Sequence, residues 1–351
     1  MHCHLLVPGF DWPQDEPIGS ACARAPEALE TLIARGRRTR TATTPGPQRW
    51  LFERFGVPRQ RDWPAAPFSL LAEGASPGSD AWMCADPVHL RIERNRLLLA
   101  DCTRFRIERE EADALAACIN THFGDILVVH PVQAQRWYAR LPACPEVESA
   151  PLSSVRGGAI EARRAHGPEA TRWQALANEV QMLLHDHPVN LAREQRDELP
   201  VNGVWLWGAG QLAKPSEHPF QCVAASDPLA RGLAQASGAR AQAPAANAQA
   251  WLAAAHDAGV VLVVLDALTA PSDYGQPEAW CEALSDLDRN WFAPLLAAIE
   301  HGDIGMLSLH LLGRDQALHA EVTRSDLRRF WRRRKPIAAW VAQALPPQTD
   351  R

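Results

Sequence analysis

The stretch Gly259–Asp266, GVVLVVLD, is an almost wholly apolar run that ends in an acidic residue. A run of this kind is typical of a parallel strand that is covered by helices on both faces. We therefore predict a central strand here, in an α/β fold with a mostly parallel sheet.

Other segments that suit the same sheet lie near both ends of the chain. The run LLVPG, Leu5–Gly9, predicts a first buried strand that ends at a turn, and Ala25–Gly36 has the apolar spacing of a helix. Late in the chain, Pro277–Gly302 predicts a long helix broken near Pro294. A strand at Ile304–Leu312 and a basic helical tail follow.

A second pattern begins at Trp82. The order of the expected elements is strand, strand, helix, strand, helix and strand, which indicates an α+β split sandwich. The segments concerned are Leu90–Asp101 with a turn at Arg94–Asn95, Glu108–Phe123, Asp125–Pro131, Arg172–His187 and Val201–Gly210. Between the two patterns, Thr43–Asp80 reads as a linker or covered loop, and Leu229–Ala250 as an alanine-rich helical segment.

Composition limits the class of protein. The chain has 351 residues, 46% of them hydrophobic, which is enough for two domains. The absence of a signal-like start and of a long apolar run predicts a cytoplasmic protein with no membrane partner. Eight cysteines without a CxxC pair suggest reduced thiols. A net charge of −5 makes nucleic acid an unfavourable main partner.

Four segments carry a family resemblance. They are Ala85–Asp101, Pro151–Ile160, Asn178–Asn190 and, most clearly, His187–Gly210 (HPVNLAREQRDELPVNGVWLWGAG). They resemble the inserted domain of archaeal-type cofactor-independent phosphoglycerate mutases, and together they are similar to the RpfE-type bacterial regulatory proteins related to those enzymes. The resemblance is specific from about Trp82 to Gly210.

The resemblance implies a reduced alkaline-phosphatase-like α/β core that is interrupted by an insert. Residues 1–81 would form the first part of the core with a covered loop, 82–213 the inserted α+β domain, and 214–351 the rest of the core with a basic tail. It also implies a regulatory role, in which the protein binds a protein partner or a phosphorylated small molecule.

The catalytic residues that the mutases need are not evident. A two-metal centre requires converging carboxylates and imidazoles. The chain offers Phe10 and Asp11 where an Asp-Gly pair is expected, then Asp266, Asp273 and Gly275, and later His310, Asp315 and His319. The weak metal candidates are thus Asp11, Asp266, Asp273, His310 and Asp315, whose spacing matches no compact ligand signature. We expect no cofactor and no catalysis; the alternative is a metal-dependent mutase or phosphatase with an altered site and two divalent ions such as Mn or Zn.

Candidate ligand-binding residues lie in the resembling block: Arg156, His187, Asn190, Arg193 and Asn202. Arg193 either ties loops together or meets a phosphate or carboxylate. Arg156 is the second candidate to meet a phosphate or carboxylate, because Gly157 and Gly158 beside it permit close backbone approach. His187 is expected to cap the preceding helix.

Two basic segments remain. In Arg324–Pro336, RSDLRRFWRRRKP, we expect a helix end whose aromatic side chains pack inward while the arginines reach water; the alternative is a site for RNA, DNA or an acidic protein. The segment GRRTRT, Gly36–Thr41, is expected to be a solvated turn, with a phosphate contact as its alternative.

Overall fold

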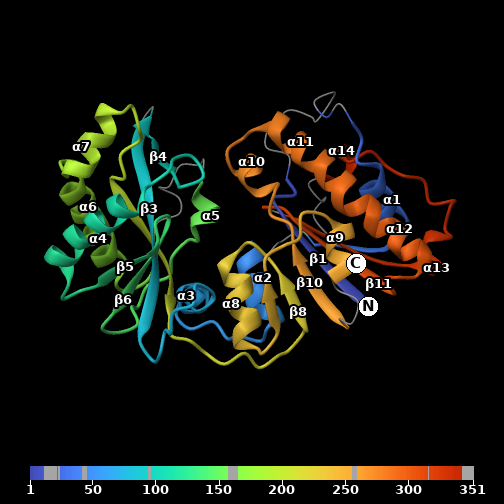
Figure 1. The fold of residues 1–351 in the computed structure, drawn as a ribbon, viewed down its shortest axis with the longest axis horizontal. Coiled ribbons are helices and arrows are strands. Elements are labelled where there is room, and N and C mark those ends of the chain that lie inside the picture. The colour runs from blue at the N-terminus through green and yellow to red at the C-terminus, as the bar shows by residue number, and fades with distance from the viewer. Residues whose placement is uncertain are drawn as a thin grey trace, which may run out of the picture. The chain divides into compact units, whose positions relative to one another are not determined.

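The computed structural model describes residues 1–11, 22, 24–41, 46–93, 96–156, 165–254, 259–314 and 316–341. The chain divides into two compact units (Figure 1). We call Met1–Phe55 together with Glu217–Arg351 the core unit, and Gly56–Ser216 the insert unit.

The core unit is built on a sheet of seven strands in the order β2-β12-β11-β1-β10-β8-β9. Strands β11, β1, β10, β8 and β9 are parallel, whereas β12 and β2 add an antiparallel edge. The strands are β1 (His2–Pro8), β2 (Arg37–Thr41), β8 (Cys222–Ala224), β9 (Arg240–Gln242), β10 (Val260–Val264), β11 (Met306–Leu312) and β12 (Ala317–Thr323).

Helices cover both faces of this sheet. Alternate side chains of β1, such as Leu5 and Val7, pack against α1, α11 and α12 in one large apolar core. On the opposite face lie α2 and α8, which contact each other. The helices are α1 (Glu27–Arg35), α2 (Gly46–Arg54), α8 (Pro228–Ala236), α9 (Ala248–Ala254), α10 (Thr269–Asp273), α11 (Pro277–Leu287), α12 (Ala293–His301), α13 (Arg324–Leu327) and α14 (Ala338–Val341).

The insert unit contains an antiparallel sheet in the order β4-β3-β6-β5, with β7 also paired to β3. Figure 1 shows α4 and α6 on one face of this sheet and α5 on the other. Its elements are α3 (Ala65–Ala72), β3 (Ala81–Glu93), β4 (Arg96–Ala100), α4 (Arg109–Phe123), β5 (Val128–Gln133), β6 (Arg136–Leu141), α5 (Leu152–Val155), α6 (Ala170–His185), α7 (Pro188–Gln195) and β7 (Gly203–Gly210).

The predicted fold class is confirmed: a mostly parallel α/β sheet is combined with a separate α+β unit. The apolar run that begins at Gly259 supplies β10, which lies between β1 and β8 and is buried from Val261 onward. Strands β3 and β4 pair antiparallel as expected, although the turn residues Arg94 and Asn95 lie outside the described part. Strong local patterns therefore gave the right element type.

Weakly patterned segments differ from expectation. The basic segment Arg37–Thr41 is a strand, β2, because it pairs with β12 at the sheet edge. The expected linker or loop at 43–80 contains α2 and α3, whose apolar side chains are buried. The predicted break near Pro294 is instead a π-helical turn, Asp288–Phe292, that joins α11 to α12 without ending the helix.

The helix α3 also bears on the boundaries between the parts. From the sequence, the first part of the core is expected to run to residue 81 and the last part to begin at 214. The contacts divide the chain at Phe55 and Ser216 instead. The reason is that α3 packs its apolar face, including Ala66 and Leu70, against Trp82 of β3 in the insert unit.

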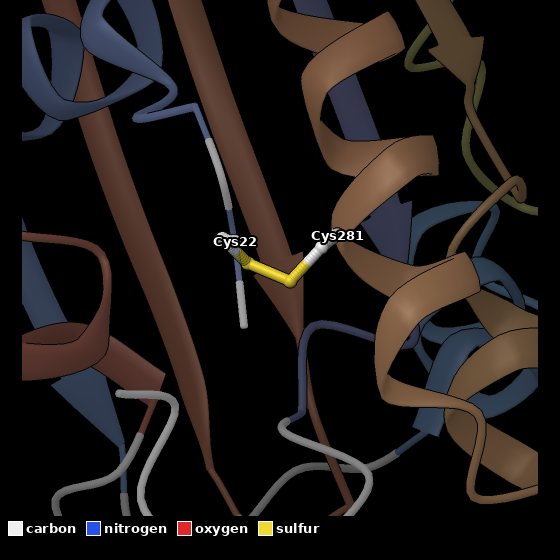
Figure 2. The surroundings of a disulfide bond; sticks show 2 residues. All are labelled: Cys22 and Cys281. Atoms are coloured by element: carbon white, nitrogen blue, oxygen red, sulfur yellow. A yellow bond between two sulfur atoms is a disulfide. The ribbon is translucent and has the colours of Figure 1, made fainter. Parts of the chain in front are cut away.

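A disulfide joins Cys22 to Cys281 of α11 (Figure 2). The two Cα atoms are 5.1 Å apart, although 259 positions separate them in sequence. The expectation of reduced thiols is therefore wrong for this pair, while the other six cysteines form no disulfide. Disulfides are rare in the cytoplasm, so this bond gives no support to the predicted compartment. Among the described residues, no helix has both the length and the apolar character of a membrane span.

Candidate functional site

The carboxyl ends of the parallel strands in the core unit meet at one edge, which is where α/β proteins usually bind their ligands. Asp11 follows β1, Asp266 follows β10, and Ser226 and Asp227 follow β8. Arg314 follows β11. Two of the predicted metal candidates, Asp11 and Asp266, thus directly follow strands at this edge, with three polar residues that the sequence patterns did not single out.

Asp11 is bound by the chain that follows β11. Its Oδ2 accepts a hydrogen bond of 2.6 Å from the backbone N–H of Arg314. Gly313 allows this approach, since a Cβ built there would lie 2.2 Å from Asp11 Oδ1. The Arg314 guanidinium donates to the carbonyl oxygen of Ser272 at 3.1 Å and lies 3.8 Å from Asp273 Oδ1. A permanent positive charge thus lies beside the predicted acids.

Asp266 has a different partner. The hydroxyl of Ser226 donates a hydrogen bond of 2.6 Å to Asp266 Oδ2. The next residue, Asp227, caps α8 by accepting from the N–H of Leu229. Burial and the nearby charge of Asp266 raise the pKa of Asp227. These side chains are fixed by helix capping and by each other.

His310 does not join the acids. It lies on β11, on the sheet face that α2 covers, where its ring is 4.8 Å from that of Trp50. Its Nε2 is 3.0 Å from His4 Nδ1, and its Nδ1 is 3.0 Å from His319 Nδ1. His2 continues the line toward Ser308. We call His2, His4, His310 and His319 the histidine row.

Burial lowers the pKa of each member of the histidine row. It lowers the pKa of His310 to about 2, with further contributions from His319 and His4. The pKa of His4 falls to about 4, through burial first and then through His2 and Arg54. Burial likewise lowers the pKa values of His2 and His319. A neutral imidazole has one N–H donor and one acceptor nitrogen, so neighbouring rings at this spacing can hydrogen-bond to one another.

The residues present do not fit a two-metal centre. Asp11 and Asp273 lie beside Arg314, Asp266 is bonded to Ser226, and His310 contacts other histidines. Asp315, the remaining candidate, lies outside the described residues. Across the described ranges, no group of three or more His, Cys, Asp or Glu side chains is placed to hold a metal ion. The structure therefore places the weak metal candidates Asp266 and His310 apart from Asp11 and Asp273.

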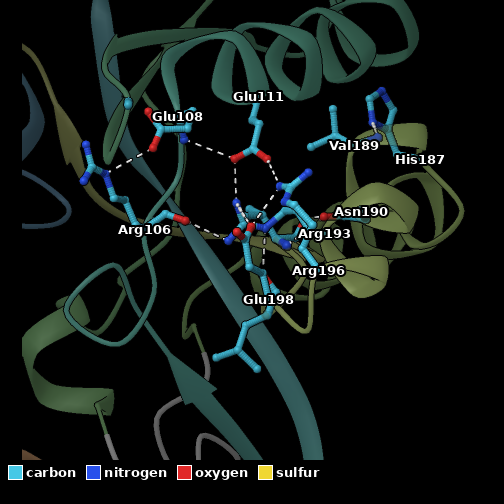
Figure 3. Close-up of polar contacts among 12 residues, drawn as sticks. Arg106, Glu108, Glu111, His187, Val189, Asn190, Arg193, Arg196 and Glu198 are labelled. Atoms are coloured by element: carbon cyan, nitrogen blue, oxygen red, sulfur yellow. Dashed lines mark hydrogen bonds and ion pairs between the residues drawn. The ribbon is translucent and has the colours of Figure 1, made fainter.

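In the insert unit, Arg193 is almost completely buried and bonded within the protein (Figure 3). Its Nε donates to the carbonyl oxygen of Leu199 at 2.8 Å, and its Nη2 to that of Arg106 at 2.7 Å. Its Nη1 contacts Glu111 Oε2 at 2.5 Å, and Arg196 binds the other oxygen of the same carboxylate. This is the loop-tying arrangement, one of the two alternatives for Arg193.

The neighbouring candidates also contact protein groups. Asn190 is buried and bonds both the carbonyl and the N–H of Val201, while Asn202 does the same with Leu90 of β3. His187 accepts from the N–H of Val189, so it caps the start of α7. We expected it to cap the preceding helix; the chain turns directly into α7 because Pro188 favours a first helical position.

Arg156 forms an ion pair with the buried Asp101, its Nε lying 2.5 Å from Oδ2. Nearby, Trp207 donates to Asp86 Oδ2 at 2.6 Å. Burial raises the pKa of Asp86 to about 6, although the bond from Trp207 and the charge of Arg156 oppose this. No sequence motif distinguishes Asp86, because its surroundings come from β7 and from α5, which are distant in sequence.

Comparisons with known proteins agree with this architecture. No family model matches the chain. It is 26% identical over 223 residues to the 2,3-bisphosphoglycerate-independent phosphoglycerate mutase of Methanosarcina barkeri, which covers 58% of this chain and 53% of that enzyme. It is 27% identical over 226 residues to a probable enzyme of the same name from Geobacter sulfurreducens, covering 60% and 56%.

The chain spans about half the length of these curated relatives. A solved structure of a protein from Pyrococcus horikoshii matches 92% of this chain and 87% of its own, with a TM-score of 0.57 and 15% identity. That likeness concerns the fold. The curated proteins that this chain matches in sequence are thus cofactor-independent phosphoglycerate mutases, and its fold is like that of the Pyrococcus horikoshii protein.

Proposed function

We propose that this chain is a noncatalytic regulatory protein of the RpfE type, which keeps the phosphoglycerate mutase architecture and acts by binding a protein partner or a phosphorylated small molecule. The observation that carries the proposal is Arg314. Its guanidinium and backbone lie among Asp11, Asp273 and Ser272 at the carboxyl edge of the core sheet.

An arginine at this edge changes what the acids can do. Two-metal phosphoryl transfer uses cations that polarise oxygens and activate a nucleophile. A guanidinium also neutralises carboxylates, but it has no open coordination position and stays protonated. The positive charge of Arg314 lies close to Asp273 and offsets part of the negative charge of this edge without a metal ion. This supports a protein that keeps the mutase architecture but does not carry out two-metal phosphoryl transfer.

The test is metal content together with turnover. The purified protein would be analysed for bound metal and assayed for phosphoglycerate mutase and phosphatase activity in added manganese, cobalt, zinc and magnesium. We expect no stoichiometric metal and no turnover, while a cofactor-independent mutase assayed in parallel is active. Metal-dependent turnover that disappears in Asp266→Ala or His310→Ala would overturn the proposal.

One observation favours the alternative, a metal-dependent mutase or phosphatase with an altered site. Ser226 presents a hydroxyl that is already bonded to the Asp266 carboxylate, and a carboxylate can serve as general base for a hydroxyl nucleophile. This alternative predicts that Ser226→Ala abolishes any activity found. If activity is detected and survives Ser226→Ala, this pair is not its site.

A further inference from the structure

The segment Arg328–Pro336 of the core unit lies between two buried residues, Leu327 and Ile337. Apart from Arg329, its residues are exposed. Phe330 and Trp331 are 79% and 66% exposed. The expectation that these aromatic side chains pack inward at a helix end is therefore wrong. The helix α13 ends at Leu327, so helical spacing no longer directs the side chains that follow.

This segment is held in place at several points. Arg332 donates to the carbonyl oxygen of Gly36 at 2.9 Å, and Arg334 binds Glu27 at 2.7 Å. The Phe330 and Trp331 rings pack edge to face, with centroids 5.3 Å apart. The exposed aromatic pair thus lies on an anchored segment. Because the segment is already ordered, less conformational entropy is lost when a partner binds to it.

The second basic segment of the sequence, β2, lies beside it. Arg38 of β2 stacks over the Trp340 ring at 5.0 Å, and Arg40 donates to the carbonyl oxygen of Trp340. Burial, and then the positive charge of Arg332, lower the pKa of Arg38. Two basic segments that lie far apart in the chain therefore form one surface. We call it the basic-aromatic surface: Arg37, Arg38, Arg328, Phe330, Trp331 and Arg333.

The charges on this surface are incompletely balanced. Within the part of the chain that the structure describes, Arg328 and Arg333 form no ion pair. Acidic side chains are nevertheless interleaved, since Glu321 pairs with Arg37 and Glu27 with Arg334. A nucleic acid would bring its dense phosphates against these carboxylates and against a chain of net charge −5. A protein segment with spaced acids and apolar residues avoids both penalties.

The composition also matches a protein interface. Exposed aromatic residues beside arginines are the side chains that contribute most to binding energy at such interfaces. We propose that the basic-aromatic surface binds an acidic segment of a partner protein. Its carboxylates meet Arg328 and Arg333, and its apolar side chains cover Phe330 and Trp331. The inference deepens the proposed function by locating the surface that binds the protein partner. It rests on the proposed function in one respect: both assume that the protein acts by binding.

The test uses short synthetic peptides in which Asp or Glu alternates with Leu or Phe, labelled for fluorescence anisotropy with the full chain. We expect saturable binding that weakens by about tenfold or more in Trp331→Ala and in the pair Arg328→Glu with Arg333→Glu. Peptides with Lys in place of the acids should not bind. Arg240→Glu, an exposed charge elsewhere in the core unit, and Met182→Ala, an exposed apolar residue in the insert unit, serve as matched controls and should bind like the unmodified chain.

Four outcomes would overturn the inference. They are an absence of saturable peptide binding, equal binding by the Trp331 variant and the controls, tighter binding of single-stranded DNA than of any peptide, and concentration-dependent dimers that Trp331→Ala abolishes. Thermal unfolding of each variant shows whether it is folded. The metal and turnover assays are independent of these measurements, so a failure of the proposed function and a failure of this inference are distinguishable.

Discussion

The insert unit buries an arginine that is bonded to protein groups, whereas the core unit holds a row of histidines whose pKa values are lowered by burial. The donors of Arg193 bind two carbonyl oxygens and the Glu111 carboxylate. His310 instead contacts His4 and His319, and burial depresses its pKa. A buried ionisable group is tolerated either with full pairing or without its charge. The two solutions should respond differently to mutation and to pH.

The largest loss of stability is expected when the buried bonds of Arg193 are removed. Arg193→Met leaves the carboxylate of Glu111 and two carbonyl oxygens without their buried partner. We expect the free energy of unfolding of the insert unit to fall by about 3–5 kcal/mol. Denaturant titration followed by hydrogen exchange in β3 and β7 measures it.

The matched control is Arg196→Met, which removes the exposed arginine from the same carboxylate. It should cost little, because exposed ion pairs contribute weakly. Equal losses in the two variants would show that burial of Arg193 is not what makes its bonds important.

The next effect concerns the disulfide between Cys22 and Cys281 in the core unit. The double variant Cys22→Ser with Cys281→Ser removes a cross-link that closes a long loop of chain. We expect the free energy of unfolding of the core unit to fall by about 2–4 kcal/mol, because the unfolded chain regains entropy.

Reduction of the unmodified protein should reproduce that loss, while Cys144→Ser, at an exposed free cysteine of the insert unit, should not. Unchanged thermal unfolding after complete reduction would contradict the prediction.

The histidine row should make the core unit sensitive to acid. Below the ordinary histidine pKa of 6.5 the unfolded chain takes up protons, whereas folded His4 and His310, with pKa values of about 4 and about 2, do not. Stability is therefore fully present above pH 6.5 and falls as the pH decreases toward 4. Each such histidine contributes a slope of up to about 1.4 kcal/mol per pH unit.

His310→Asn should flatten this dependence, as measured by urea denaturation across the same pH range. His301→Asn, at an exposed histidine of the same unit, should leave the slope as it was. A slope that is identical in both variants would exclude His310 as its source.

The smallest expected effect is a dependence of stability on pH in the insert unit, and its direction is opposite to that in the core unit. Asp86 has its pKa raised from 3.8 to about 6, chiefly by burial, so the folded state holds a proton that the unfolded state has released. Its contribution to stability is present below pH 3.8 and is lost as the pH rises through 6. Because Trp207 donates to Asp86, its fluorescence should titrate near pH 6.

Asp86→Asn should remove that titration while leaving the acid sensitivity of the core unit intact. A titration near pH 6 that persists in this variant would assign the signal to another group.

Sequence reasoning succeeded where one segment carries its own evidence. The apolar run at Gly259 and the segment Val201–Gly210 gave the right elements, because a buried strand leaves a direct trace in residue order. It failed at β2 and at Phe330 and Trp331. Arginine-rich stretches fit a strand, a turn or a helix equally well until the neighbouring element is known.

The sequence by itself determined the fold class, most of the elements and the absence of a recognisable two-metal ligand signature, since all three depend on residues that are close together in the chain. Only the tertiary structure decided which distant residues meet: Arg314 with Asp11, His310 with His4, Cys22 with Cys281, and β2 with the segment after α13. The physical reason is that charge balance, protonation and cross-linking depend on distance in space, which residue spacing does not encode for positions hundreds of residues apart.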